Sequence, residues 1–168
     1  MPTALPPRRL VLGIVLLALA AMPALGQTRT VETTLGTFEV PENPTRIVTT
    51  HHANTQTLLD LGIVPVGRGA VAQGYTTPEQ WAAIAEVPSI ALEGGELNYE
   101  LIASLDPDLI LEVDLASSPE RIERLRQIAP VVITPLRGED FRFGKSPQIA
   151  EVVNAVDRWE ALEAEYAA

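Results

Sequence analysis

The sequence predicts an α/β fold: a doubly wound, mostly parallel sheet with an N-terminal hairpin before it and a long helix after it. Two observations predict this fold. Through the middle of the chain, short apolar runs alternate with segments of helical periodicity, and strand followed by helix, repeated, implies parallel strands with right-handed crossovers. From residue 147 to 166, apolar side chains recur every three and four residues, which indicates one long closing helix.

The expected elements follow from these patterns. A hairpin is expected at residues 28–40, where apolar side chains alternate on either side of Gly36 before Pro41 ends the pattern. Five apolar runs are expected to form the strands of the sheet, at residues 46–49, 63–66, 89–91, 109–113 and 131–134. Four segments are expected to form the crossover helices, at residues 54–61, 78–85, 99–105 and 119–128.

Two of these helices have recognisable starts. Thr77 before Pro78, and Ser118 before Pro119, place a capping hydroxyl ahead of a proline at the first helical position. Ligands of doubly wound sheets bind beyond the carboxyl ends of the strands. The loops that follow the expected strands are therefore the places to look for a binding site.

Residues 1–26 have the order of a secretory signal peptide. Arg8 and Arg9 precede an apolar run from residue 10 to 21, and a small-residue cleavage site follows at residues 24–26. The apolar run is shorter than the roughly 20 residues that a spanning helix needs. We therefore expect export, with no membrane-embedded segment in the mature protein.

Composition narrows the function classes. The chain has 12 Lys and Arg against 22 Asp and Glu, a formal net charge of −10, and such a surface would repel the phosphate backbone of nucleic acids. It has no cysteine, so neither a disulfide nor a lipid anchor on a cysteine is expected. Residues 27–168 are enough for one domain, which buries about two-thirds of its unfolded surface.

Five short motifs occur in a specific order along the chain, at residues 42–48 (ENPTRIV), 58–67 (LLDLGIVPVG), 98–100 (NYE), 105–110 (LDPDLI) and 128–132 (IAPVV). This order resembles the N-terminal lobe of the periplasmic substrate-binding proteins that serve ABC importers of iron siderophores, haem and cobalamin. In that family, two Rossmann-like lobes are joined by one long rigid helix and the ligand lies between them.

The resemblance implies a domain organisation. Residues 27–146 would be the N-terminal solute-binding lobe, and residues 147–168 would be the start of the inter-lobe helix, with the second lobe absent. The chain would then be a fragment, a truncated gene product, or a lobe whose partner supplies the missing half. Because an unanchored solute-binding protein would diffuse away from a cell with one membrane, we expect a periplasmic location.

The resemblance also implies ligand-binding residues in the strand-end loops. Arg68, Tyr75 and Trp81 have the spacing of the siderophore-type members, and Arg137 and Arg142 follow the fifth expected strand. Arginine can pair bidentately with carboxylate or hydroxamate oxygens, and an aromatic face can stack on a flat ligand. The alternatives are that Arg68 is a solvated loop charge and that Trp81 belongs to the core.

His51 and His52 end the first expected strand of the sheet and are the two histidines of the chain. Neighbouring residues of an extended chain point to opposite faces, so the pair should not hold one metal ion together. One could donate a hydrogen bond to a ligand oxygen, while the other has a structural role. We expect neither a metal site nor a resident cofactor: iron would enter only within a bound siderophore, and haem only as a ligand.

Other functions have weaker support. Residues 67–72 match the dinucleotide-binding pattern G-x-G-x-x-A, but Pro78 and the residues before it delay the helix that should follow directly. The sequence contains no G-x-S-x-G, P-loop or H-E-x-x-H motif. A ferric siderophore is the expected ligand, a haem- or cobalamin-binding lobe is the alternative, and a small exported α/β enzyme is the alternative of another class.

Two interactions with partners are expected. The resemblance places Glu120 where an acidic residue of the family meets an arginine of the permease, although an acid in a first helical turn also stabilises the helix by itself. The apolar stripe from Trp159 to Tyr166 has no obvious cover. An uncovered stripe of this kind tends to recruit a partner, so self-association through the closing helix is also expected.

Overall fold

A computed structural model describes residues 27–136 and 145–167 of the 168-residue chain. Its strands are β1 Thr28–Thr33, β2 Gly36–Pro41, β3 Ile47–Thr49, β4 Gly67–Arg68, β5 Leu109–Val113 and β6 Val131–Thr134. Its helices are α1 His52–Asp60, α2 Pro78–Ile84, α3 Tyr99–Ser104, α4 Pro119–Arg126, α5 Lys145–Val152 and α6 Val156–Ala167, with short 3-10 helices η1 Gln73–Tyr75 and η2 Glu93–Gly95.

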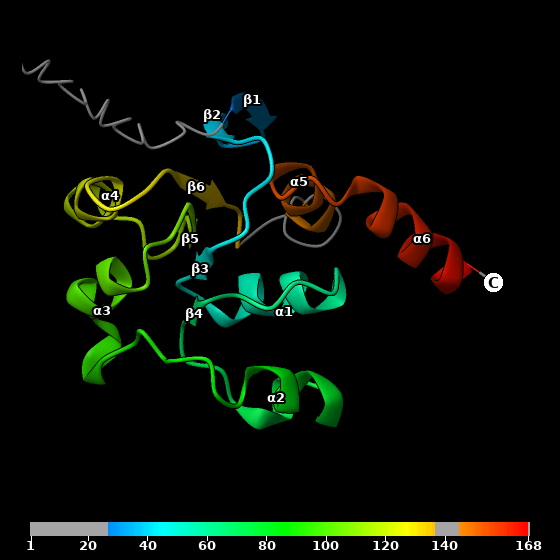
Figure 1. The fold of residues 1–168 in the computed structure, drawn as a ribbon, viewed down its shortest axis with the longest axis horizontal. Helices are drawn as coiled ribbons and strands as arrows, with labels where there is room; N and C mark the ends of the chain where they lie inside the picture. The colour runs from blue at the N-terminus through cyan, green and yellow to red at the C-terminus, as the bar shows by residue number, and fades with distance from the viewer. Residues whose placement is uncertain (1–26, 137–144, 168) are drawn as a thin grey trace, which may run out of the picture.

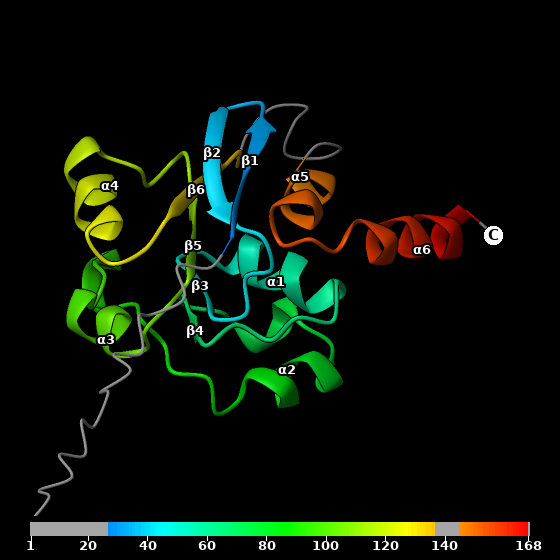
Figure 2. The ribbon, with the colours of Figure 1, turned by 45° about the horizontal axis from the view of Figure 1, so that its top comes forward.

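The strands form two sheets. A four-stranded sheet has the order β4-β3-β5-β6 with every neighbouring pair parallel, and β1 and β2 form a separate antiparallel hairpin. Figure 1 shows α3 and α4 on one side of the parallel sheet and α1 and α5 on the other. Figure 2 shows the hairpin beside α5 and β6. The predicted fold class and the predicted hairpin are therefore confirmed.

Both faces of the parallel sheet are buried at β3, β5 and β6, which explains why apolar residues predominate in these strands. In β5, Leu109 and Leu111 point into the core beneath α1 and α5, whereas Ile110 points into the core beneath α3 and α4. All three side chains are fully buried. The alternation of a strand thus divides one apolar run between two cores.

The starts of β3 and β5 are fastened to each other by two of the motifs. The Asp108 carboxylate accepts hydrogen bonds from the backbone N–H of Thr45 at 2.7 Å and of Arg46 at 3.0 Å. In return, the Arg46 guanidinium donates to the carbonyl oxygens of Asp106, at 2.8 Å, and Leu105. These are the carbonyls where α3 ends, so one arginine both caps a helix and fixes the register of two strands.

The β4 side of the parallel sheet differs from the predicted arrangement. Residues 63–66 are not a strand, and the chain pairs with β3 only at β4, after Val66 N–H has donated to the carbonyl of Ile47. Residues 89–91 make only isolated bridges: Ser89 lies parallel to Arg68, and Ala91 turns back to pair with Leu97. The described sheet therefore has four strands rather than five, because residues 89–91 make one bridge to Arg68 and then leave the sheet.

The helix starts follow the predicted caps. The Thr77 hydroxyl accepts from Gln80 N–H while the Gln80 side chain accepts from Thr77 N–H, which is a capping box. The Ser118 hydroxyl accepts from Arg121 N–H at the start of α4. Hydrogen bonds from its own backbone N–H and from the Thr77 hydroxyl lower the pKa of Glu79 in the first turn of α2.

The closing segment is not one continuous helix. It is divided into α5 and α6 at Asn154, whose φ of 57° lies in the left-handed region. Asn154 N–H donates to Glu151 O at 3.0 Å and Ala155 N–H donates to Ala150 O at 2.7 Å. These two bonds form a Schellman motif that ends α5. The apolar periodicity from residue 147 to 166 was correct, but the asparagine at its centre was not recognised as a stop signal.

Helix α6 extends away from the body of the protein (Figure 1) and has no buried residue. Val156 is 42% and Tyr166 90% exposed, while Trp159 and Leu162 pack partly against the core. A hollow of about 290 Å³ lies between α6, the last turn of α1 and the first turn of α2. Self-association through this helix stays a prediction. In the part of the chain that the structure describes, no helix has the length and apolar character needed to cross a membrane.

Asn154 provides the first test. Asn154→Ala should lower the free energy of unfolding by about 1 to 2 kcal/mol, because alanine has a Cβ that disfavours a left-handed backbone. Asn154→Gly should lower it by less, since glycine adopts this conformation without strain and loses only the exposed hydrogen bond from Asn154 Nδ2 to Asn43 Oδ1. Urea unfolding followed by circular dichroism measures both. An alanine variant as stable as the glycine variant would show that the break does not depend on residue 154.

Candidate functional site

The carboxyl ends of β3, β4, β5 and β6 meet at one edge of the parallel sheet, which we call the C-terminal edge. Helices α1 and α4 begin at this edge, since they follow the carboxyl ends of β3 and β5. Ligands of doubly wound sheets bind at such an edge.

Three predicted residues, His51, His52 and Tyr75, come together on one side of the edge. The ring centroids of the two histidines are 4.1 Å apart, and the His52 and Tyr75 rings stack at 4.9 Å. Tyr75 comes from η1 and is 64% exposed. Tyr75 lies more than 20 positions after the two histidines in the sequence, and the fold makes the three rings one aromatic surface that a solute can reach.

The expectation that the two histidines point to opposite faces is wrong, because their rings lie side by side. The expectation assumed an extended chain at both positions, but only His51, with φ −136° and ψ 146°, is extended, and His52 is the first residue of α1. His51 Nδ1 accepts a hydrogen bond from Ala53 N–H at 3.2 Å and so caps the helix. This is the structural role predicted for one of the pair, and it leaves His52 beside Tyr75.

Arg68 and Trp81 form a second group, which is directed towards α2. Arg68 Nε donates to the carbonyl oxygen of Ile84 at 3.3 Å, in the last turn of α2, and its guanidinium carbon lies 5.8 Å from the centroid of the Trp81 ring. Both side chains are half-buried. Arg68 thus helps to satisfy the end of a helix, in addition to any contact with a ligand.

The glycines of the G-x-G pattern have a packing explanation. A Cβ on Gly69 would lie 2.3 Å from the carbonyl oxygen of Thr50, because the ends of β3 and β4 approach closely. Any larger residue would push the His51 turn away from β4. At Gly67 a Cβ would lie 2.5 Å from the Leu105 side chain, so the two glycines reflect close packing against a backbone and against a core side chain.

A buried carboxylate that sequence reasoning missed lies at the centre of the C-terminal edge. Glu112 in β5 is fully buried. Its Oε1 accepts from the Thr50 hydroxyl at 2.7 Å and from Val113 N–H at 2.8 Å, and its Oε2 accepts from Arg121 Nε at 2.6 Å. Arg121 is itself only 15% exposed. Burial of a charge is tolerated here because each carboxylate oxygen is hydrogen-bonded.

Hydrogen-bonded side chains also line the α1 side of this edge. The Thr134 hydroxyl lies 2.9 Å from Asn54 Oδ1 and 3.0 Å from the carbonyl of Glu112, and Thr49 and Thr55 share a 2.7 Å hydrogen bond. The signal for this network was present in the sequence. An acid within the apolar run LILEV, and threonines at the ends of two other strands, are polar residues in positions where apolar ones were expected.

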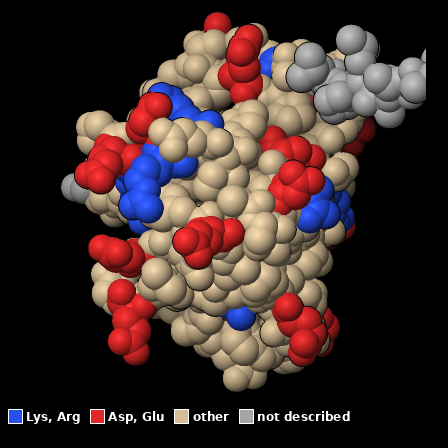
Figure 3. Space-filling model, turned by 60° about the vertical axis from the view of Figure 1, so that its left-hand side comes forward, with Lys and Arg blue, Asp and Glu red and all other residues tan. Residues whose placement is uncertain are grey.

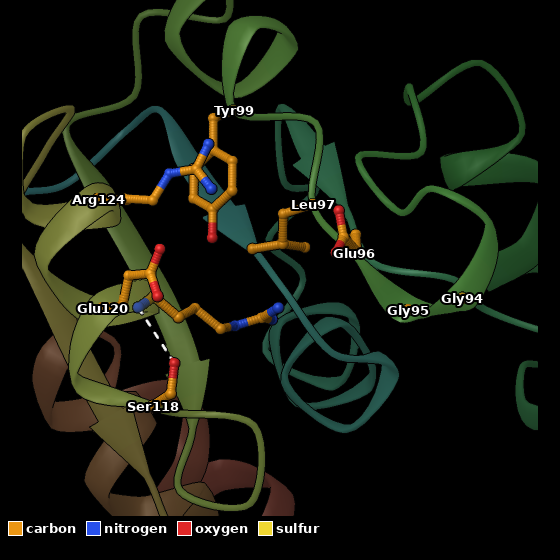
Figure 4. A pocket seen from close by; sticks show the side chains of 9 residues that line it. Gly94, Gly95, Glu96, Leu97, Tyr99, Ser118, Glu120 and Arg124 are labelled. Carbon is orange, nitrogen blue, oxygen red and sulfur yellow. Dashed lines mark hydrogen bonds between the residues drawn. The ribbon is translucent and has the colours of Figure 1, made fainter.

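The α3 and α4 side of the edge is hollowed and highly charged. Figure 3 shows basic side chains gathered on this face with acidic ones around them, and α4 supplies Arg121, Arg124 and Arg126. A hollow of about 250 Å³ lies between the η2 turn and the starts of α3 and α4. Figure 4 shows the Arg124 guanidinium beside the Tyr99 ring, with Glu120 on the same side of the hollow. The guanidinium carbon lies 3.7 Å from the ring centroid.

Glu120, the predicted docking residue, is exposed in the first turn of α4 and lines this hollow. Arg137 and Arg142, two further predicted ligand residues, lie outside the described residues, as does the predicted leader at 1–26. Among the residues that are described, no three His, Cys, Asp or Glu side chains are grouped so that they could hold a metal ion.

The sequence profile of the periplasmic binding protein family matches residues 47–168. The chain belongs to this family. The probable siderophore-binding lipoprotein YfiY of Bacillus subtilis is 33% identical over 147 residues, which cover 83% of this chain and 43% of that protein. The iron(3+)-hydroxamate-binding protein YxeB of the same organism is 25% identical over 140 residues, covering 83% and 40%.

Solved structures of siderophore-binding proteins have the same fold. The siderophore periplasmic binding protein from the fuscachelin gene cluster of Thermobifida fusca matches with a TM-score of 0.64 and 28% identity, over 76% of this chain and 48% of its own. Staphylococcus aureus SirA, solved with staphyloferrin B, matches with a TM-score of 0.67 and 24% identity, over 83% and 47%. The resemblance seen in the five motifs is thus confirmed. The chain spans less than half the length of these relatives.

The Glu112–Arg121 pair provides the second test. Glu112→Gln or Arg121→Met should lower the free energy of unfolding by about 3 to 5 kcal/mol, since either change leaves a buried charge without its partner. The double variant should lose less than the sum of the two. Urea unfolding measures all three, and Glu123→Gln, an exposed residue of the same helix, should change stability by less than about 0.5 kcal/mol. Additive losses would contradict a direct interaction.

Proposed function

We propose that this chain is a solute-binding lobe of an exported component of an ABC importer, and that its solute is a ferric siderophore. The names of the relatives support the class of solute. The observation that carries the proposal is the surface formed by His51, His52 and Tyr75, at the edge of the sheet where this fold binds ligands. The periplasmic location is proposed as well, on the basis of the signal peptide predicted at residues 1–26.

The chemistry of this surface suits a ligand whose metal is already coordinated. Tyr75 and His52 present a flat aromatic face, and their phenol and imidazole groups can hydrogen-bond to oxygen atoms on the outside of a ferric complex. Iron would then be cargo, held by the oxygens of the siderophore. We propose solute binding without catalysis and without a resident cofactor, and the relatives, which are named as binding proteins, support this class.

The affinity of the 168-residue chain should be low. A single lobe contacts one face of a ligand and leaves the other face wet, so much of the surface that ligand sites normally bury stays exposed. A dissociation constant in the high micromolar to millimolar range, about 4 to 6 kcal/mol, is expected. Nanomolar affinity of the monomeric chain in calorimetry would contradict the view that it supplies one face only.

The third test uses equilibrium dialysis of purified protein, at roughly millimolar concentration to match the expected dissociation constant, against ferrioxamine B, haemin and cobalamin in separate experiments. At equilibrium the protein compartment should retain an excess of the ferric absorbance. Tyr75→Ala should weaken binding about tenfold, because a stacked aromatic contributes up to about 1.5 kcal/mol, and Tyr75→Phe should retain most of the affinity. Tyr166→Ala is the matched control, since that tyrosine lies on α6 and is 90% exposed.

Each alternative predicts a different result in the same experiment. A retained Soret band would indicate haem binding, and a retained corrinoid spectrum would indicate cobalamin binding. If Tyr75→Ala and Tyr166→Ala bound the ferric complex equally well, the aromatic surface would not be the site. Retention of none of the three chromophores would leave the exported enzyme as the better hypothesis.

The fourth test concerns docking to the importer through Glu120. A carboxylate in the first turn of α4 is favoured by the helix dipole, so Glu120→Gln should lower helix stability by at most about 1 kcal/mol. It should leave ligand binding unchanged and weaken association with the cognate permease, by a margin that shrinks in high salt. Glu123→Gln, one turn along the same helix, should bind the permease normally. Equal association of both variants at low ionic strength would remove Glu120 from the docking surface.

A further inference from the structure

We propose that Glu112 and Arg121 are positioning residues that hold the aromatic ligand surface and the docking helix in one fixed arrangement. This inference rests on the proposed function, because that function gives roles to His51, His52, Tyr75 and Glu120. Neither Glu112 nor Arg121 is assigned a contact with ligand or permease. Both would act through the residues next to them in the chain.

The first argument is that stability alone does not explain Glu112. Its neighbours Ile110, Leu111 and Val113 are all buried and apolar. A buried ion pair is often no more stabilising than well-packed apolar residues of similar volume, because both charges lose their hydration. What a carboxylate provides in addition is direction, since its hydrogen bonds fix the positions of the donors around it.

The second argument is that the two carboxylate oxygens of Glu112 bind two different segments of the chain. Oε1 accepts from the Thr50 hydroxyl at 2.7 Å, and Oε2 accepts from Arg121 Nε at 2.6 Å. Thr50 immediately precedes the His51–His52 pair, and its N–H also donates to Leu111 O at 3.0 Å. One side of the carboxylate therefore holds the turn that carries the histidines, and the other side holds the start of α4.

The third argument is that Arg121 fixes the residue beside it. Arg121 N–H donates to the Ser118 hydroxyl at 3.2 Å, while its side chain reaches Glu112. Glu120 lies between these two anchored residues in the first turn of α4. Its carboxylate is exposed, but the backbone that carries it is held from both sides. The position of the docking acid relative to the ligand surface is thereby set through one buried carboxylate.

The fourth argument identifies a variant that removes this arrangement with little change of shape. Glu112→Gln replaces one oxygen by an NH2 group. With the NH2 towards Arg121, two donors would meet there and that attachment would be lost. With the NH2 towards Thr50, the hydroxyl could still accept while donating to Leu111 O, but the NH2 would meet Val113 N–H, a second donor. Either orientation of the amide therefore loses at least one hydrogen bond that the carboxylate makes.

The test uses the two histidines as built-in reporters. Because the chain has no others, their ring signals can be followed by NMR during a pH titration without any ligand. Glu112→Gln leaves Arg121 unpaired, so the midpoints of the histidine titrations should fall. Arg121→Met leaves Glu112 unpaired, so they should rise. Arg121→Lys, which keeps the charge, should lie nearer the wild type.

A merely structural role predicts a different pattern. Ile149→Ala removes a buried side chain of α5 and should also destabilise the fold, but it should leave both histidine titrations unchanged. The proposal is overturned if the titrations of Glu112→Gln and Arg121→Met superimpose on that of the wild type, or if Ile149→Ala shifts them equally.

A binding experiment completes the test and separates the two proposals. With ferrioxamine B as the probe, Glu112→Gln should bind about tenfold more weakly than the wild type, although residue 112 is buried. Unchanged affinity would count against positioning. If the wild type retains no ferric complex, the proposed function fails, while the histidine titrations still report whether Glu112 and Arg121 act on the histidine turn.

Discussion

The arrangement of this protein depends on the parallel pairing of β3 with β5. The pair is fixed at its start by Asp108, which accepts from the backbone of Thr45 and Arg46, and at its end by Glu112, which accepts from Thr50. A parallel strand pair with apolar side chains on both faces has little in its composition to define register, because a shifted pairing would bury similar groups. The two carboxylates supply that definition, and the cores on either side then assemble around a fixed pair.

The sequence was sufficient for the fold class, since the alternation of apolar runs with helical segments and the capping residues Thr77 and Ser118 are local signals. It was insufficient where the outcome depended on neighbours in space. Residues 63–66 have the composition of a strand, but pairing begins only at β4. The closing segment has the periodicity of one helix, but a single asparagine in the left-handed region divides it. Periodicity describes which side chains face the core and does not show whether the backbone is continuous.

The types of residue at the candidate site could be predicted from the sequence, but their contacts with one another could not. The expected strand end indicates His51 and His52, and the spacing of the family indicates Arg68, Tyr75 and Trp81, but nothing in the sequence indicates that the His52 and Tyr75 rings stack. The contacts of Arg68 with Ile84 and Trp81 come from a helix that only the fold brings near. Glu112 lies inside an apolar strand, and an acid in that position is itself a signal of a buried polar site.

The Schellman motif at Asn154 has a consequence for cooperativity. Helix α5 contributes Ile149, Ala150 and Val152 to the core, whereas α6 contributes no buried residue. Since hydrogen bonds in one helix do not continue into the other, the two helices can open separately. The 12 residues of α6 therefore form a segment of low local stability. The direction of this helix relative to α5 is set by the left-handed backbone of Asn154.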